Sequence, residues 1–171
     1  MKVFIFIVVL CTLVLGGTGI MLIRTTAHDP AEWHVDPLTF PTPETPNTFR
    51  VAPEIEGYEA VTTERIDQLS PIYDANPAII SKAWDDFVLR QPRTIRIAGN
   101  PEEGWMTYVQ TSEFWRFPDY ISVLFLDLGN GQSTIAVYSR SRFGYGDMGV
   151  NQARINAWLE PLESFVVETP L

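Results

Sequence analysis

The amino-acid sequence predicts an α+β fold: a curved antiparallel β-sheet packed against two helices and preceded by a single N-terminal transmembrane helix. Residues 3–23 contain no charged side chain. Four consecutive segments, 94–98, 105–111, 120–128 and 132–142, have the apolar content and the alternation of β-strands. Amphipathic helices are predicted before and after this run, and strands grouped between helices are typical of α+β domains.

The uncharged segment at residues 3–23 has the length of a membrane-spanning helix. At about 1.5 Å per residue it spans roughly 30 Å, the thickness of a bilayer's hydrocarbon core. A cleaved secretory signal is the alternative, with Thr25-Thr26-Ala27 as a weak cleavage site, although the apolar core of a signal runs only about 7–15 residues. We therefore expect residues 1–28 to form a retained membrane anchor, so that the lipid bilayer is one partner.

The orientation of the predicted anchor depends on the charges that flank it. Lys2 lies at one end, and Arg24 lies at the other, where the acidic residues Asp29 and Glu32 follow. The positive-inside rule leans slightly toward a cytoplasmic N-terminus. We expect a single-pass protein of the bacterial inner membrane with its domain on the periplasmic side.

Residues 29–53 contain six of the thirteen prolines. Because proline disfavours helix and lacks a backbone N–H, this segment is predicted to be an extended spacer, followed by the α+β domain at residues 54–171. Trp33 lies about ten residues beyond the anchor and is predicted to sit at the membrane interface, as interfacial tryptophans do. Packing of Trp33 against the domain or a partner is an equal alternative.

Composition argues against several kinds of partner and cofactor. The formal net charge is −9, so the surface as a whole repels nucleic acid, and no nucleic-acid partner is expected. Cys11, the one cysteine, lies within the predicted anchor, so no disulfide is expected in the domain. His28 and His34 have no cysteine or acidic partner at metal-ligand spacing. Neither a metal site nor a cofactor is predicted.

Two amphipathic helices are predicted. The first begins after Asn76, a favourable N-cap that is followed by a proline, and it ends at Pro92. Asp85 and Asp86 are predicted on its solvated face. The second helix covers residues 150–162. The two apolar stripes consist of Ile80, Trp84, Phe87 and Val88, and of Ile155, Trp158, Leu159 and Leu162.

The strongest turn signal is Asn130-Gly131, which predicts a hairpin between the last two strands. Alternation in residues 132–142 places Ser139 and Ser141 on one face, and Arg140 and Arg142 on the other. A terminal edge strand is predicted at residues 165–171.

Residues 144–149 fit the G-x-G-x-x-G spacing of a dinucleotide-binding turn. The fingerprint fails on context, because only 22 residues follow it and the preceding strand already belongs to a hairpin. Two interpretations remain open. In one, Asp147 or Asn151 caps the helix and pairs with Arg142 or Arg154; in the other, the helix N-terminus binds an anion or a partner. The candidate residues are Arg140, Arg142, Gly144, Gly146, Asp147, Gly149, Asn151 and Arg154.

The same block resembles the signature of the family called domain of unknown function 1499, S-R-S-R-x-G-x-x-D-x-G-x-N-x-x-R-I, which residues 139–155 match in order and spacing. Pro46-Asn47 is similar to an early proline–asparagine step of the family, which a cysteine often follows. Thr48 stands there instead, which argues against a metal or redox role. The resemblance covers roughly residues 46–162 and implies no known reaction.

Three hypotheses on function follow. The first is a membrane-anchored, non-catalytic accessory protein whose exported domain docks on a larger membrane protein complex. The second is a binding module for a lipid-like or other small anionic amphipathic ligand, with Arg140 or Arg142 holding its anionic head. The third is a hydrolase of unknown substrate, although no catalytic residue is predicted. Ser139 and Ser141 have no base nearby in sequence, and no G-x-S-x-G motif occurs.

Overall fold

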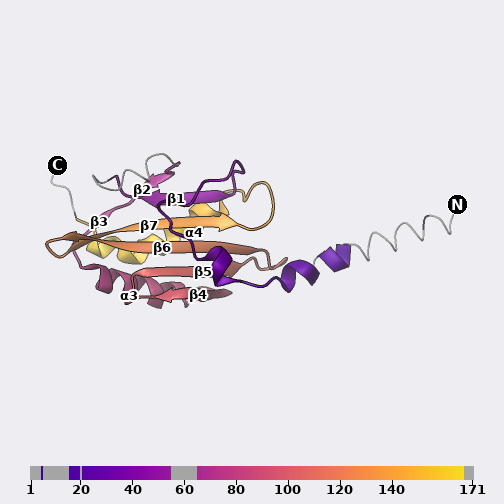
Figure 1. Cartoon of the computed structure of the whole chain (residues 1–171), viewed down its shortest axis with the longest axis horizontal. Helices are drawn as coiled ribbons and strands as arrows, with labels where there is room; N and C mark the ends of the chain where they lie inside the picture. The colour runs from indigo at the N-terminus through magenta and orange to yellow at the C-terminus, as the bar shows by residue number, and fades with distance from the viewer. Residues whose placement is uncertain (1–4, 6–15, 20, 55–64, 168–171) are drawn as a thin grey trace.

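A computed structural model describes residues 5, 16–19, 21–54 and 65–167. It contains a seven-stranded, mostly antiparallel sheet with a few helices, which confirms the predicted α+β class. The strand order is β2-β1-β7-β6-β5-β4, and β3 also pairs with β7 (Figure 1). The strands are β1 (Thr48–Ala52), β2 (Gln68–Leu69), β3 (Ile72–Tyr73), β4 (Thr94–Asn100), β5 (Trp105–Thr111), β6 (Pro118–Gly129) and β7 (Gln132–Ser141).

Most of the predicted anchor at residues 3–23 lies outside the described residues. Residues 16–19 and 21–24 are helical, and Figure 1 shows them extending away from one end of the sheet. Within the described ranges, no helix combines the length and the apolar character that are needed to cross a membrane.

The long strands β6 and β7 form the hairpin predicted from Asn130-Gly131. The φ angles are 53° at Asn130 and 80° at Gly131, and a type I′ turn requires positive values at both positions. Strands β5 and β4 extend the sheet antiparallel on one side of this hairpin. On the other side β1 pairs antiparallel with β7, and β2 is parallel to β1. The predicted strands 94–98, 105–111, 120–128 and 132–142 thus all form.

Helices α3 (Pro77–Val88) and α4 (Val150–Leu159) cover one face of the sheet (Figure 1). The side chain of Asn76 accepts a hydrogen bond from the backbone N–H of Ile79 at 3.2 Å, as its predicted N-cap role requires. Between the helices, the rings of Trp84 and Trp158 meet edge to face with centroids 5.8 Å apart. Both predicted apolar stripes face this core, and of their eight residues only Phe87 is partly exposed.

Asp85 is the exception on α3, because the prediction of a solvated side chain is wrong. It is buried, accepts a hydrogen bond from the Tyr108 hydroxyl at 2.8 Å and pairs with Arg96 at 2.7 Å. These two partners offset the cost of removing a carboxylate from water. Burial, together with Asp85, raises the pKa of Tyr108 far above its usual value. Asp86 is exposed and pairs with Lys82, as predicted for the solvated face.

The second face of the sheet is covered by the N-terminal segment at residues 27–40, which we call the strap. It includes the short helix α2 (Pro30–Trp33) and crosses strands β5, β6 and β7 (Figure 1). Leu38 is buried in a small core with Ala136 and Leu126. Within residues 29–53, which are predicted to be an extended spacer, residues 30–33 are helical and residues 48–52 form β1. Covering a sheet face that would otherwise be open to water favours this packing. Strand β1 also begins before the predicted domain boundary at residue 54.

The chain after α4 continues as the 3₁₀-helix η2 (Glu160–Phe165). Pro161 lacks the N–H that an α-helix needs there, so the helical pattern predicted up to residue 162 tightens after Leu159. Val166 then forms an isolated bridge with Tyr73. The rest of the edge strand predicted at residues 165–171 lies partly outside the described residues.

Candidate functional site

The predicted site residues lie on both faces of the sheet. Arg140 and Arg142 are on the strap face, where they contact residues of the strap. Asn151 and Arg154 are on α4, on the helix face, where both contact Ser139 of β7. The structure therefore brings Asn151 and Arg154 together and separates them from the other two side chains.

On the helix face, Arg154 is the centre of a buried polar network. Its guanidinium pairs with Asp119 at 2.5 Å and donates to Gln110 at 2.6 Å and to the Asn151 side-chain oxygen at 2.6 Å. Ser139 donates to the same Asn151 oxygen at 2.6 Å. Asp119 supplies the negative charge that a cation near a helix N-terminus needs. The network ties α4 to β5, β6 and β7.

Asp147 connects the glycine-rich turn to the first turn of α4. Its carboxylate accepts hydrogen bonds from the backbone N–H groups of Asn151 at 2.8 Å and Gly149 at 3.1 Å. Gly144 and Gly149 have φ angles of 94° and 79°, which favour glycine, whereas Gly146 has no positive φ. The N-cap position of α4 is occupied by Gly149, and not by Asp147 or Asn151 as predicted. The predicted arginine partner differs, since Arg154 pairs with Asp119.

On the strap face, two signature arginines hold the N-terminal segment. Arg140 donates from Nη2 to the backbone carbonyl of Trp33 at 2.6 Å and stacks over the Trp33 ring at 5.3 Å. Arg142 donates to the carbonyl of Ala27 at 3.2 Å and to the Tyr120 hydroxyl at 3.3 Å. Burial lowers the pKa of Arg140 to about 10, so it stays a cation at neutral pH.

Trp33 itself packs on the sheet. Its ring stacks on Tyr120 with centroids 3.7 Å apart and an interplanar angle of 10°. Of the two locations that the sequence left open for Trp33, the structure places it against the domain. The side chain is half-buried between this ring and the arginines.

Both histidines of the strap also form hydrogen bonds with hydroxyl groups of the sheet. His28 Nδ1 lies 2.8 Å from the Tyr120 hydroxyl, and His34 Nδ1 lies 2.9 Å from the Thr107 hydroxyl. Partial burial lowers the pKa of both histidines. Arg142 lowers the pKa of His28 further, whereas Glu103 raises the pKa of His34 and offsets part of the effect of burial. Across the described part of the chain, no three His, Cys, Asp or Glu side chains gather into a group that would hold a metal ion.

A pocket of about 560 Å³ lies between the strap and β7. Its lining combines the rings of Trp33, Phe40 and Tyr138 with the guanidinium groups of Arg140 and Arg142. Apolar walls next to a cation are suited to a ligand that has an apolar body and an anionic head. We call this the strap pocket.

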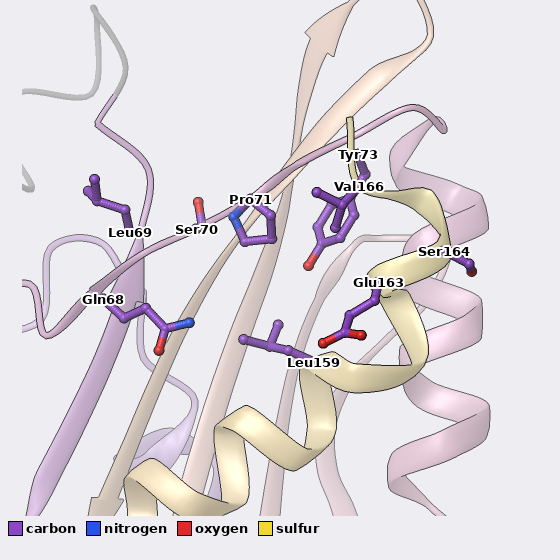
Figure 2. Close-up of a pocket in the computed structure, with 9 residues that line it drawn as sticks. All are labelled: Gln68, Leu69, Ser70, Pro71, Tyr73, Leu159, Glu163, Ser164 and Val166. Carbon is purple, nitrogen blue, oxygen red and sulfur yellow. The ribbon is translucent and has the colours of Figure 1, made fainter. Parts of the chain in front are cut away.

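A larger pocket of about 680 Å³ lies at the other end of the sheet, between β2, β3 and η2 (Figure 2). Tyr73 is fully buried, and its hydroxyl is without a hydrogen-bond partner in the described part of the chain. Figure 2 shows this hydroxyl and the Glu163 carboxylate pointing into the same space. Exposed Leu69 and Val166 also line it. We call this the distal pocket.

Sequence reasoning missed the distal pocket for a physical reason. Strands β2 and β3 have two residues each, which is too short for any periodicity to be recognised. A signal was nevertheless present in Ser70-Pro71, which interrupts the chain between two apolar residues, Leu69 and Ile72.

The signature block at residues 139–155 lies within a region that matches a known protein family. A family model described as "Protein of unknown function (DUF1499)" matches residues 40–162. The match extends from the end of the strap to η2, so it contains every strand of the sheet together with α3 and α4. No match is found among curated proteins.

Proposed function

This chain belongs to the DUF1499 family, and from that premise we propose that it is a membrane-anchored, non-catalytic interaction protein. Its exported domain docks on a larger membrane protein complex, and the distal pocket receives an apolar segment of that partner. Residues 3–23 provide the single-pass anchor in the bacterial inner membrane, with the domain in the periplasm.

The observation that carries this proposal is the Tyr73 hydroxyl. A buried hydroxyl that lacks a hydrogen-bond partner is destabilising by about 1–3 kcal/mol, and such groups are rare in native proteins. Tyr73 is one of the residues that line the distal pocket, although its hydroxyl oxygen is itself covered from solvent. A partner segment that enters the pocket and displaces the groups covering this oxygen can offer it a hydrogen-bond acceptor. Apolar groups of the same partner cover Leu69 and Val166, which are otherwise in water.

The strap supports the membrane-anchored part of the proposal. Because Arg140 and Arg142 hold residues 27–33 against the sheet, the domain begins close to the predicted anchor. A freely extended spacer of 25 residues would instead let the domain rotate and move away. A fixed attachment holds the distal pocket in one orientation relative to the membrane.

Blue-native electrophoresis of mildly solubilised membranes tests the docking. Leu69→Asp places a charge at the pocket rim, and Ile95→Asp is a matched control on the opposite edge strand β4, since the two residues are 58% and 55% exposed. The wild-type chain and Ile95→Asp are expected in a complex, and Leu69→Asp is expected as the free protein. Migration of the wild-type chain as a free monomer, or of Leu69→Asp in the complex, would contradict the proposal.

The strap pocket supports a second candidate function, the binding of an anionic amphipathic ligand. Arg142 is half-buried at its edge and is positioned to meet an anionic head, while Trp33 and Phe40 provide apolar walls. Native mass spectrometry of the purified full chain tests it. The wild-type chain and the exposed-site control Arg90→Gln are expected to carry an added mass that Arg142→Gln loses. A wild-type chain without added mass excludes this candidate.

A further inference from the structure

Five large apolar side chains are exposed in two loops at one end of the sheet. The loops are residues 112–117, between β5 and β6, and residues 142–149, between β7 and α4. Phe114 is 79% exposed and Met148 is 100% exposed. The set, which we call the aromatic end, consists of Phe114, Trp115, Phe143, Tyr145 and Met148. Exposed apolar groups that are concentrated in one place mark an interaction surface.

Strand register places the two loops side by side. Thr111 pairs with Pro118 where β5 meets β6, and Asp119 pairs with Ser141 where β6 meets β7. Both loops therefore leave the same end of the sheet. The ring of Phe117 in the first loop lies 6.2 Å from the ring of Phe143 in the second, between centroids.

Residues 21–24, at the end of the predicted anchor, lie at this same end of the sheet. Arg24, the first charged residue after that segment, donates to the backbone carbonyl of Phe114 at 3.2 Å. Arg142, in the second loop, donates to the carbonyl of Ala27 at 3.2 Å. Figure 1 shows the helical residues 21–24 leaving the domain at the same end of the sheet as these loops. The aromatic end is thus continuous with the predicted anchor.

Arginines accompany the aromatic side chains, together with the acidic residues Glu113 and Asp147 of the same loops. Arg24 and Arg116 line a small pocket with His28 and Ile23, about 340 Å³ in volume. Aromatic rings at the headgroup level and arginines near phosphates are the features of a surface that rests on a bilayer. Arg24 and Arg116 can each complement a lipid phosphate, although the surface as a whole repels an anionic headgroup.

We propose that the aromatic end rests in the headgroup region of the bilayer that residues 3–23 cross. Phe114, Trp115, Tyr145 and Met148 enter the interface, and Arg24 and Arg116 bind lipid phosphates. This contact rests on the anchor in the proposed function and deepens it, because it sets the orientation of the domain. The distal pocket adjoins the other end of β7, where Ile72 pairs with Thr134, and so it faces away from the membrane.

Tryptophan quenching in nanodiscs tests the contact with the full chain. Residues 1–28 contain no tryptophan, so all quenching by lipids brominated near the headgroup reports on residues 29–171. The variants are Trp115→Phe and, as a control, Trp105→Phe at the far end of β5. Wild type and Trp105→Phe are expected to show the same quenching, and Trp115→Phe is expected to lose most of it.

The outcomes separate this contact from the anchor. Equal quenching in Trp115→Phe and wild type, with both retained in the nanodiscs, would overturn the contact alone. Elution of every variant apart from the nanodiscs would overturn the anchor, and the contact with it. Addition of anionic phosphatidylglycerol to the nanodiscs is expected to increase the quenching of wild type and to have less effect on an Arg24→Gln, Arg116→Gln double variant.

Discussion

The Nη2 atom of Arg140 donates to the backbone carbonyl oxygen of Trp33 across 107 positions of sequence, at 2.6 Å. This bond connects the family signature in β7 to the strap and explains why a proline-rich segment lies on the sheet. The guanidinium is buried among the rings of Trp33, Phe40 and Tyr138, which compensate part of the cost of removing a cation from water. Arg140 therefore holds the strap, which connects the predicted anchor to the domain, against the sheet.

Replacing Arg140 by Gln is expected to release the strap. The hydrogen bonds of a charged donor contribute about 1.5–3 kcal/mol, and their loss should lower the free energy of unfolding by about that amount. Hydrogen exchange should increase in residues 27–40 more than in β6 and β7. Arg90→Gln, at an exposed position, is the control. Unchanged exchange in the strap of Arg140→Gln would show that the arginine does not hold it.

Asp119→Asn is expected to be strongly destabilising, and much more so than Asp86→Asn. It leaves the buried guanidinium of Arg154 without its charge partner, which typically costs about 3–5 kcal/mol. Asp86→Asn breaks the exposed pair with Lys82 and should cost less than about 1 kcal/mol. Urea denaturation of both variants checks the contrast, and equal losses would argue against a structural role for the network.

Tyr73→Phe and Tyr120→Phe are expected to change stability in opposite directions. Tyr73→Phe removes a hydroxyl that has no partner in the described part of the chain, so it should stabilise the free protein by about 1 kcal/mol. Tyr120→Phe removes a hydroxyl that contacts both His28 and Arg142, so it should destabilise. Thermal unfolding measures both. A destabilised Tyr73→Phe variant would mean that the hydroxyl already has a partner within the chain.

The strap is expected to loosen as the pH falls. The pKa values of His28 and His34 are lower in the folded protein than the ordinary value of 6.5, mainly because of burial. The stability that their neutral forms contribute is therefore complete above about pH 6.5 and is lost as the pH falls through the folded-state values. The measurement is the hydrogen-exchange protection factor of residues 27–40, which corrects for the effect of pH on exchange itself and should be lower at pH 5.5 than at pH 7.5. The difference in protection between pH 7.5 and pH 5.5 should be smaller in a variant that carries both His28→Gln and His34→Gln.

Local patterns were sufficient for the helices and the long strands. Asn130-Gly131 predicted the hairpin, and the stripes around Trp84 and Trp158 predicted the core face. Alternation also predicted that Arg140 and Ser139 would lie on opposite faces. It did not reveal that α4 would cover the Ser139 face, because that depends on how the helix folds back. The separation of Arg154 from Arg140 follows from this packing.

The strap and Asp85 show what composition does not capture. Prolines correctly indicated that residues 29–53 would lack long helices, but contact between Leu38 and Ala136 depends on residues far apart in sequence. Likewise Asp85 lies next to Asp86 and differs from it only because Tyr108 and Arg96 of the sheet reach it. Long-range partners of this kind have no local signal in the sequence.

Photocrosslinking in native membranes tests the docking claim most directly. A benzophenone amino acid at position 69, at the rim of the distal pocket, is predicted to give one discrete adduct with a membrane protein. The same group at position 95, on the opposite edge of the sheet, is predicted to give none. Absence of an adduct from position 69, or equal adducts from both positions, would contradict the account.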